Sequence, residues 1–121
     1  MPNNTFEHVA VIGAGTMGHG IAQVCAMAGM EVRLFDVKDE ALQRGLDMVH
    51  LNLDKGVDRG KVDPDERDAT LQRLAGTTDI EIAVDGADLV VEAVTENEGL
   101  KNSIFGHLDK VLQEHAILAS N

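Results

Sequence analysis

Residues 7–36 read EHVAVIGAGTMGHGIAQVCAMAGMEVRLFD, and the pattern of apolar residues changes twice within them. Residues 7–12 are a short apolar run that ends at a glycine, which is typical of a buried strand. From Thr16 to Gly29 the apolar residues recur at the spacing of an amphipathic helix. Residues 31–36 form a second apolar run and predict a second strand. A strand, a tight turn, a helix and a strand within about 30 residues make one βαβ unit, whose crossover we expect to be right-handed.

The chain after this unit is longer than one connecting helix needs. An apolar stripe predicts a helix, and a polar turn with Gly56 and Gly60 follows it. Asp63-Pro64-Asp65-Glu66 predicts the start of a second helix, with an N-cap, a proline at the first helical position and a capping-box glutamate. We expect this helix to end at Gly76, which gives a helical hairpin. The stripe consists of Leu42, Leu46, Val49 and Leu53, and Leu71 and Leu74 form the apolar side of the second helix.

The remaining chain alternates strands with helices. We expect a short strand over 78–80, a short helix over 81–84, a buried strand over 87–94, a helix whose apolar stripe runs over 100–112 and a strand over 116–119. This alternation predicts an α/β fold with a doubly wound parallel sheet of the Rossmann type. The helical hairpin is inserted between the second and third strands.

The composition fits one globular domain over residues 1–121, since single cores hold on the order of 100–150 residues. Apolar residues make up 44% and charged residues 26%, which excludes a disordered tail or a disulfide scaffold. The net charge of −11 disfavours nucleic acid and anionic membranes as partners. The lone Cys25 and the absence of a leader or membrane-span pattern lead us to expect a cytoplasmic protein.

Residues 13–18, GAGTMG, match the pattern G-x-G-x-x-G between a predicted strand and a predicted helix. Gly13 permits the tight turn, Gly15 lets a pyrophosphate approach the backbone, and Gly18 lets the helix pack close to the strand. The N–H groups at the helix start then bind the anion. Dinucleotide binding is the function that this context predicts.

Asp36 ends the second predicted strand, 18 residues after Gly18. A carboxylate there accepts hydrogen bonds from ribose hydroxyls and repels a 2′-phosphate, so we expect NAD rather than NADP. Arg33 and Lys38 are the alternative partners for a phosphate, but Arg33 lies within the strand and Lys38 lies beyond the carboxylate. The competing interpretation is a glycine turn with a merely solvated Asp36.

A second polar cluster follows the strand predicted over 87–94. If that strand lies beside the first, its carboxyl end faces the glycine turn at the switch point of the sheet, where ligands bind. Glu96 and Lys101 would then contact a cofactor ribose. The alternative is a helix-capping acid with an exposed lysine. The cluster consists of Glu92, Thr95, Glu96, Asn97 and Lys101.

Four runs of the sequence resemble the NAD-binding domain of the 3-hydroxyacyl-CoA dehydrogenases. They extend in order from His8 to Asn121 and read HVAVIGAGTMGHGIAQVCAMAG, EVRLFDVKDEALQRGL, ADLVVEAVTENEGLK and AILASN. The resemblance implies hydride transfer from an L-3-hydroxyacyl-CoA to NAD, as in fatty-acid oxidation. It implies that the hairpin contributes to the coenzyme A site, near Asn52 and Arg59. The expected cofactor-binding residues are Gly13, Gly15, Thr16, Met17, Gly18, Gly20, Asp36, Glu96 and Lys101.

The sequence also departs from the family pattern. In the family, the Ser-Asn pair is followed by a substrate-contacting serine, a catalytic His–Glu pair and a helical domain with most of the dimer interface. The sequence stops at Asn121 before all of these, so we expect no catalytic residue in it and no turnover by this chain alone. Glu98-Gly99 replaces better helix formers. His19 lies near the turn but has no evident carboxylate to orient it as a general base.

Two other functions stay open at this point. One is a stand-alone NAD-binding module without catalysis, and the other is the cofactor half of a related dehydrogenase that acts on small 3-hydroxy acids. No residues have metal-ligand spacing. We expect the complete protein to be a homo-oligomer with an acyl-CoA substrate, and this chain to self-associate through the edge of its last strand.

Overall fold

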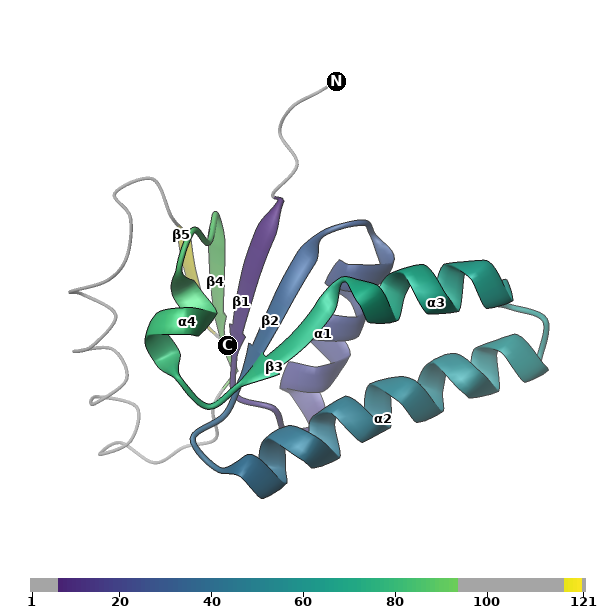
Figure 1. The fold of residues 1–121 in the computed structure, drawn as a ribbon, viewed down its shortest axis with the longest axis horizontal. Coiled ribbons are helices and arrows are strands. Elements are labelled where there is room, and N and C mark those ends of the chain that lie inside the picture. Colours follow the sequence, from purple (N-terminus) through teal and green to yellow (C-terminus); the bar gives the residue numbers. More distant parts are fainter. Residues whose placement is uncertain (1–6, 94–116, 121) are drawn as a thin grey trace.

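Five parallel strands form one sheet in the order β3-β2-β1-β4-β5 (Figure 1). The computed structural model describes residues 7–93 and the backbone of residues 117–120. From β1 the chain passes outward through β2 to β3 and then returns to the other side of β1, which is the doubly wound arrangement expected. The strands are β1 (His8–Ile12), β2 (Glu31–Phe35), β3 (Leu74–Thr77), β4 (Leu89–Glu92) and β5 (Ile117–Ser120).

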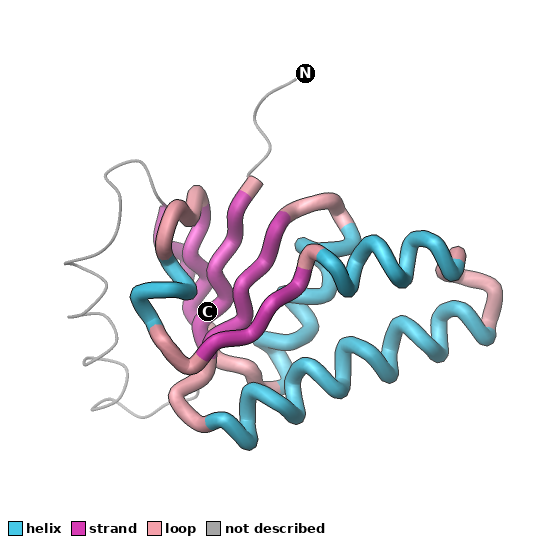
Figure 2. The backbone as a smooth tube through the Cα atoms, in the orientation of Figure 1, coloured by secondary structure: helices cyan, strands magenta, loops and turns pink. Residues whose placement is uncertain are grey.

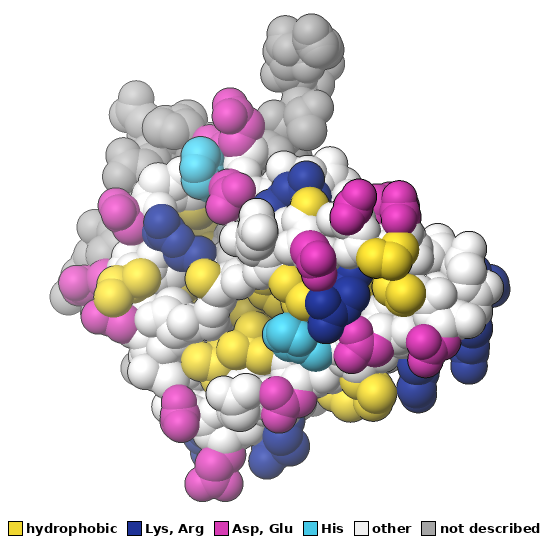
Figure 3. All heavy atoms as spheres, turned by 45° about the vertical axis from the view of Figure 1, so that its right-hand side comes forward, with side chains coloured by type: hydrophobic (Ala, Val, Ile, Leu, Met, Phe, Trp, Pro, Cys, Tyr) yellow, Lys and Arg dark blue, Asp and Glu magenta, His cyan; other side chains and the backbone are white. Residues whose placement is uncertain are grey.

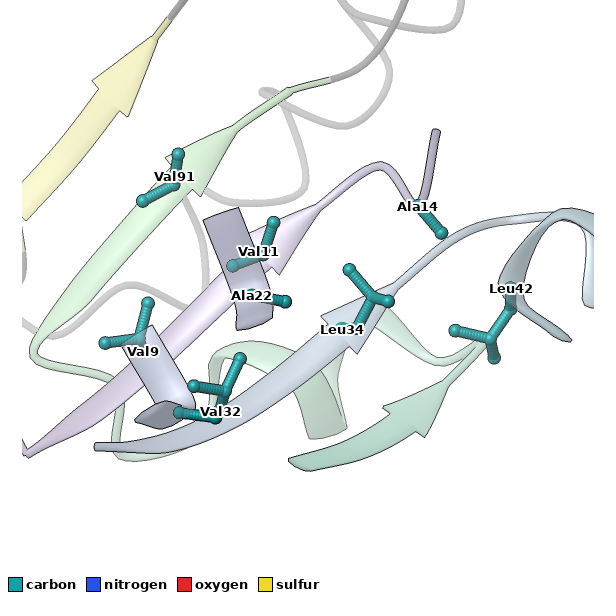
Figure 4. Close-up of a cluster of buried hydrophobic side chains, with 9 residues drawn as sticks. Val9, Val11, Ala14, Ala22, Val32, Leu34, Leu42 and Val91 are labelled. Atoms are coloured by element: carbon teal, nitrogen blue, oxygen red, sulfur yellow. The ribbon is translucent and has the colours of Figure 1, made fainter. Parts of the chain in front are cut away.

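Helices cover both faces of the sheet (Figure 2). Helices α1 (Thr16–Met27), α2 (Asp39–Asp58) and α3 (Pro64–Gln72) lie on one face, and α4 (Ile80–Val84) lies on the other. Because helices cover both faces, side chains that alternate along each strand enter two separate hydrophobic cores. The first core gathers Val9 and Val11 of β1 with Val32 and Leu34 of β2 beneath α1 (Figure 4), whereas the second packs against α4. Burial on both faces accounts for the near-continuous apolar runs of the strands.

Helices α2 and α3 form the expected hairpin between β2 and β3, and it extends beyond the sheet (Figure 1). Arg67 of α3 holds the pair together by donating from Nε to Asp54 Oδ1 of α2 at 2.6 Å. The hairpin turn begins later than predicted, because Gly56 lies inside α2. A Cβ at Gly56 would lie 2.6 Å from Val62 Cγ2, so this glycine makes room for the returning chain.

The third strand is the main error of the sequence prediction. We expected Leu74 in a helix that Gly76 ends, and a strand over 78–80, whereas β3 covers Leu74–Thr77 and pairs with β2. The physical reason is that α2 covers this strand: a Cβ at Gly76 would lie 2.9 Å from Leu46 Cδ1 and 3.0 Å from Leu42 Cδ1. Gly76 is therefore a point of close packing and does not end a helix.

The other predicted elements that fall on described residues are confirmed, with ends that differ by up to two residues, except that α3 ends at Gln72 instead of continuing to Gly76. The strand expected over 87–94 is the shorter β4, and the strand expected over 116–119 is β5. The helix expected near 81–84 is α4. The helix predicted over 100–112 lies outside the described residues. Within the described part, no helix is both long and apolar enough to cross a membrane.

Replacing Asp63 by alanine is expected to lower the free energy of unfolding by about 1 kcal/mol. Asp63 is the N-cap of α3, and its backbone N–H donates to Glu66 Oε1 at 3.3 Å in a capping box. Urea unfolding followed by circular dichroism measures the change. Asp65→Ala is the control, because it removes an acid from the same helical turn without removing the cap. Equal losses in the two variants would contradict the capping role.

Candidate cofactor-binding site

The glycine turn joins the end of β1 to the start of α1. Gly13 has φ +108°, a backbone conformation that residues with side chains rarely adopt. Its N–H donates to the Phe35 carbonyl at the end of β2, with N···O of 2.7 Å. A Cβ at Gly18 would lie 1.7 Å from Gly13 O. Both glycines therefore have the structural tasks predicted for them, a tight turn and close packing of the helix on it.

The outer side of the turn is open. A Cβ at Gly15 or at Gly20 would meet no other atom within 4 Å, and Gly15, Thr16 and Met17 are exposed. Gly15 is the N-cap of α1, so no side chain caps the first N–H groups, and the first turn holds no acidic residue. These N–H groups and the positive end of the helix dipole favour an anion. The residues present thus fit the pyrophosphate of a dinucleotide.

The Asp36 carboxylate is fixed beside the turn. Its Oδ2 accepts a hydrogen bond from Ala14 N and its Oδ1 accepts one from Lys38 N, both at 3.0 Å. A carboxylate has about four lone-pair positions, so both oxygens retain capacity to accept from a ligand hydroxyl. Sequence reasoning missed the bond from Ala14, because the donor is a backbone group brought close by tertiary structure.

The strand predicted over 87–94, which is β4, lies beside β1, as the switch-point hypothesis required. β4 pairs with β1 in parallel, and Ala93 N donates to Ile12 O at 2.8 Å. The carboxyl end of β4 therefore lies next to the glycine turn. Glu92, at this end, is completely buried. The other members of the predicted cluster, Thr95, Glu96, Asn97 and Lys101, lie outside the described residues.

The two residues expected near coenzyme A lie on or next to α2. Asn52 is half-buried, and its Nδ2 donates to Gln23 Oε1 of α1 at 3.2 Å. Arg59 caps the carboxyl end of the same helix. The structure therefore gives Asn52 a contact between two helices and places Arg59 near the tip of the hairpin. It does not bring the two residues into one cluster with the glycine turn.

Residues 8–121 match the family model described as the 3-hydroxyacyl-CoA dehydrogenase NAD-binding domain. The chain belongs to this family. The matched part is the cofactor-binding domain, so the expectation of NAD as the cofactor is confirmed. The doubly wound α/β fold agrees with the solved dehydrogenase structures that the chain resembles.

The names of individual relatives of this NAD-binding domain fit the same family. The chain is 44% identical to 3-hydroxyadipyl-CoA dehydrogenase of Escherichia coli, over 95% of the chain and 24% of that protein. It is 42% identical to a 3-hydroxybutyryl-CoA dehydrogenase of Mycobacterium tuberculosis, over 98% of the chain and 42% of that protein. The solved (S)-3-hydroxybutyryl-CoA dehydrogenase of Ralstonia eutropha has a TM-score of 0.89 at 38% identity, over 97% of this chain and 41% of that one. The chain thus spans less than half the length of these relatives.

No catalytic or metal centre was expected in this NAD-binding domain. The described side-chain hydrogen bond of His19 runs from its ring Nδ1 to the Gly15 carbonyl at 2.9 Å, so a carbonyl and not a carboxylate orients the ring. Among the described residues, no three His, Cys, Asp or Glu side chains gather as metal ligands.

Alkylation of Cys25 in this NAD-binding domain is expected to be slower than alkylation of an unfolded thiol at the same pH. Cys25 is half-buried on α1, and burial raises the pKa of its thiol. The stabilising contribution of the neutral thiol is therefore present below about pH 8.5 and is lost as the pH rises through the folded pKa. The rate of reaction with iodoacetamide against pH measures this, with the urea-unfolded chain as control. Identical pH profiles for folded and unfolded chains would contradict it.

Proposed function

We propose that this domain binds NAD(H) for an L-3-hydroxyacyl-CoA dehydrogenase, which oxidises a 3-hydroxyacyl-CoA to the 3-ketoacyl-CoA in fatty-acid oxidation or a related pathway. The observation that carries the proposal is the Asp36 carboxylate, held by Ala14 N–H beside the uncapped start of α1. A carboxylate and an open helix N-terminus at the ends of adjacent parallel strands suit a ribose and a pyrophosphate.

In this proposal the chain binds and orients the cofactor. Bound NAD supplies the hydride acceptor. The N–H groups of Thr16 and Met17 bind the pyrophosphate, and the missing side chain of Gly15 leaves room for it. Asp36 accepts hydrogen bonds from the adenosine ribose and repels a 2′-phosphate. Glu96 and Lys101 are further cofactor contacts on the basis of the family resemblance. The complete set is Gly13, Gly15, Thr16, Met17, Gly18, Gly20, Asp36, Glu96 and Lys101.

The substrate and the partners are part of the same proposal. The names of the relatives support a coenzyme A thioester as substrate, with Asn52 and Arg59 on the hairpin as its contacts. We assign no catalytic residue to residues 1–121, which form one NAD-binding domain, and we propose that the complete protein is a homo-oligomer. A cytoplasmic location suits the free thiol of Cys25, although two plant relatives are named as peroxisomal.

The test assays the complete natural protein to which this sequence belongs. NADH consumption is measured with acetoacetyl-CoA and, separately, with acetoacetate, which is the same 3-keto group without coenzyme A. Rapid consumption with the thioester and little with the free acid is the expected result. Consumption with the free acid alone would favour a dehydrogenase of small 3-hydroxy acids. NADH binding with no turnover of either compound would indicate a binding module instead.

A further inference from the structure

The glycine turn faces a second wall, which α2 contributes. A pocket of about 200 Å³ lies between the two. Gly15, Thr16 and His19 line it on the side of the turn and α1, and Arg44 and Met48 line it on the side of α2. This pocket adjoins the open face of Gly15, where the proposed function places the pyrophosphate.

Close packing fixes α2 against the turn. A Cβ at Gly45 would lie 2.6 Å from Ala14 O and 3.0 Å from Ala14 Cβ. Both are atoms of the turn itself, so the α2 backbone touches it at this point. Arg44 is the adjacent residue in the chain, and its backbone therefore keeps a fixed position relative to the turn. A glycine in a helix interior lowers helix stability by about 1 kcal/mol relative to alanine. At Gly45 this loss is accepted because only glycine lets α2 lie this close to the turn.

Arg44 has no partner within the described part of the protein. Of the five arginines there, Arg33 donates to the carbonyls of Ile82 and Asp85, Arg67 pairs with Asp54 and Asp68, and Arg73 donates to the Ala26 carbonyl. Arg44 and Arg59 make no described side-chain hydrogen bond or ion pair. Acidic side chains are spread over the molecular face in Figure 3, with Lys and Arg among them. An arginine that borders the turn without an acidic partner is available to a ligand.

We propose that Arg44 binds a diphosphate held between the glycine turn and α2. The inference rests on the proposed function. The N–H groups of α1 offer only partial charges to the anion, whereas the guanidinium adds a full positive charge and a planar pair of donors that suits phosphate oxygens. Binding from two opposite walls offsets the repulsion that a net charge of −11 exerts on such a ligand. The diphosphate belongs either to the dinucleotide or to coenzyme A.

The test compares Arg44→Gln with Lys61→Gln. Both variants lose one positive charge, but Lys61 lies in the turn between α2 and α3, away from the pocket. Dissociation constants are measured for NADH by nicotinamide fluorescence and for coenzyme A by calorimetry. We expect Arg44→Gln to weaken one of these ligands about tenfold, as for the loss of one charge-assisted hydrogen bond. For NADH, Lys61→Gln should stay within about twofold of the parent, because a surface charge distant from the glycine turn is largely screened.

Each result is decisive. A loss for NADH alone assigns Arg44 to the dinucleotide, and a loss for coenzyme A alone assigns it to the thioester substrate. Equal affinities of Arg44→Gln and the parent for both ligands would overturn the inference and leave the proposed function intact. Equal losses of NADH affinity in Arg44→Gln and Lys61→Gln would also overturn it, since they would reflect net charge only. A parent chain that binds no NADH would overturn the proposed function and this inference with it.

Discussion

A chain carrying Gly18→Ala is expected to lose about 3 kcal/mol of its free energy of unfolding or more, and with it the cofactor site. The added Cβ would lie 1.7 Å from Gly13 O and 2.7 Å from Gly13 C. Both are backbone atoms of a turn that the bond from Gly13 N–H to Phe35 O holds in place. No flexible side chain can move aside, so α1 or the turn itself has to shift.

Urea unfolding followed by circular dichroism measures this loss, and Gly20→Ala is the matched control. Gly20 lies two residues further along α1, and a Cβ there would meet no other atom within 4 Å. Alanine is the better helix former, so Gly20→Ala should gain about 0.5–1 kcal/mol. If Gly18→Ala unfolds at the same urea concentration as the parent, the close contact between α1 and the turn is wrong.

Asp36→Ala is expected to weaken NADH binding by about 30-fold to 1,000-fold, which corresponds to about 2–4 kcal/mol. The carboxylate has two proposed tasks, accepting from the ribose and holding the turn through Ala14 N–H. Asp36→Ala removes both the acceptor for the ribose and the acceptor for Ala14 N–H. It also removes the negative charge that repels a 2′-phosphate, so NADPH should lose much less affinity, and the preference for NADH should fall or disappear.

Fluorescence titrations of both nucleotides measure the preference, with two control variants. Asp39→Ala removes the same charge three residues away, at the start of α2, and should leave the preference unchanged. Asp36→Asn keeps one oxygen that can accept from Ala14, so it should bind NADH less tightly than the parent but retain the turn. An Asp36→Ala chain that still prefers NADH as strongly as the parent would show that another group selects the cofactor.

Sequence patterns predict this fold well where the signals are local. The first strand, the glycine turn and α1 follow from apolar spacing and from Gly13 and Gly18, which lie five residues apart and pack against each other. The start of α3 follows from the capping sequence at Asp63. The first strand and α1 lie within two residues of their predicted ends, and α3 begins at Pro64 as predicted.

The errors arise where distant segments decide the structure. β3 is a strand because it pairs with β2 and because α2 leucines cover Gly76, and neither cause is visible in its short sequence LAGT. Gly56 resembles a turn residue, yet it lies inside α2, where its missing side chain makes room for Val62. The second wall of the site was missed for the same reason. Its one sequence signal is Gly45, a glycine within a helix that otherwise has a regular apolar stripe.

The most direct test of the central claim is a titration of the unmodified chain with NADH and then NADPH, followed by nicotinamide fluorescence. The chain has no Trp and no Tyr, so protein emission interferes little. The account predicts saturable NADH binding and NADPH binding at least about tenfold weaker, since the Asp36 carboxylate accepts from a ribose hydroxyl and repels a phosphate at the same position. An absence of NADH binding, or equal affinity for the two nucleotides, would contradict it.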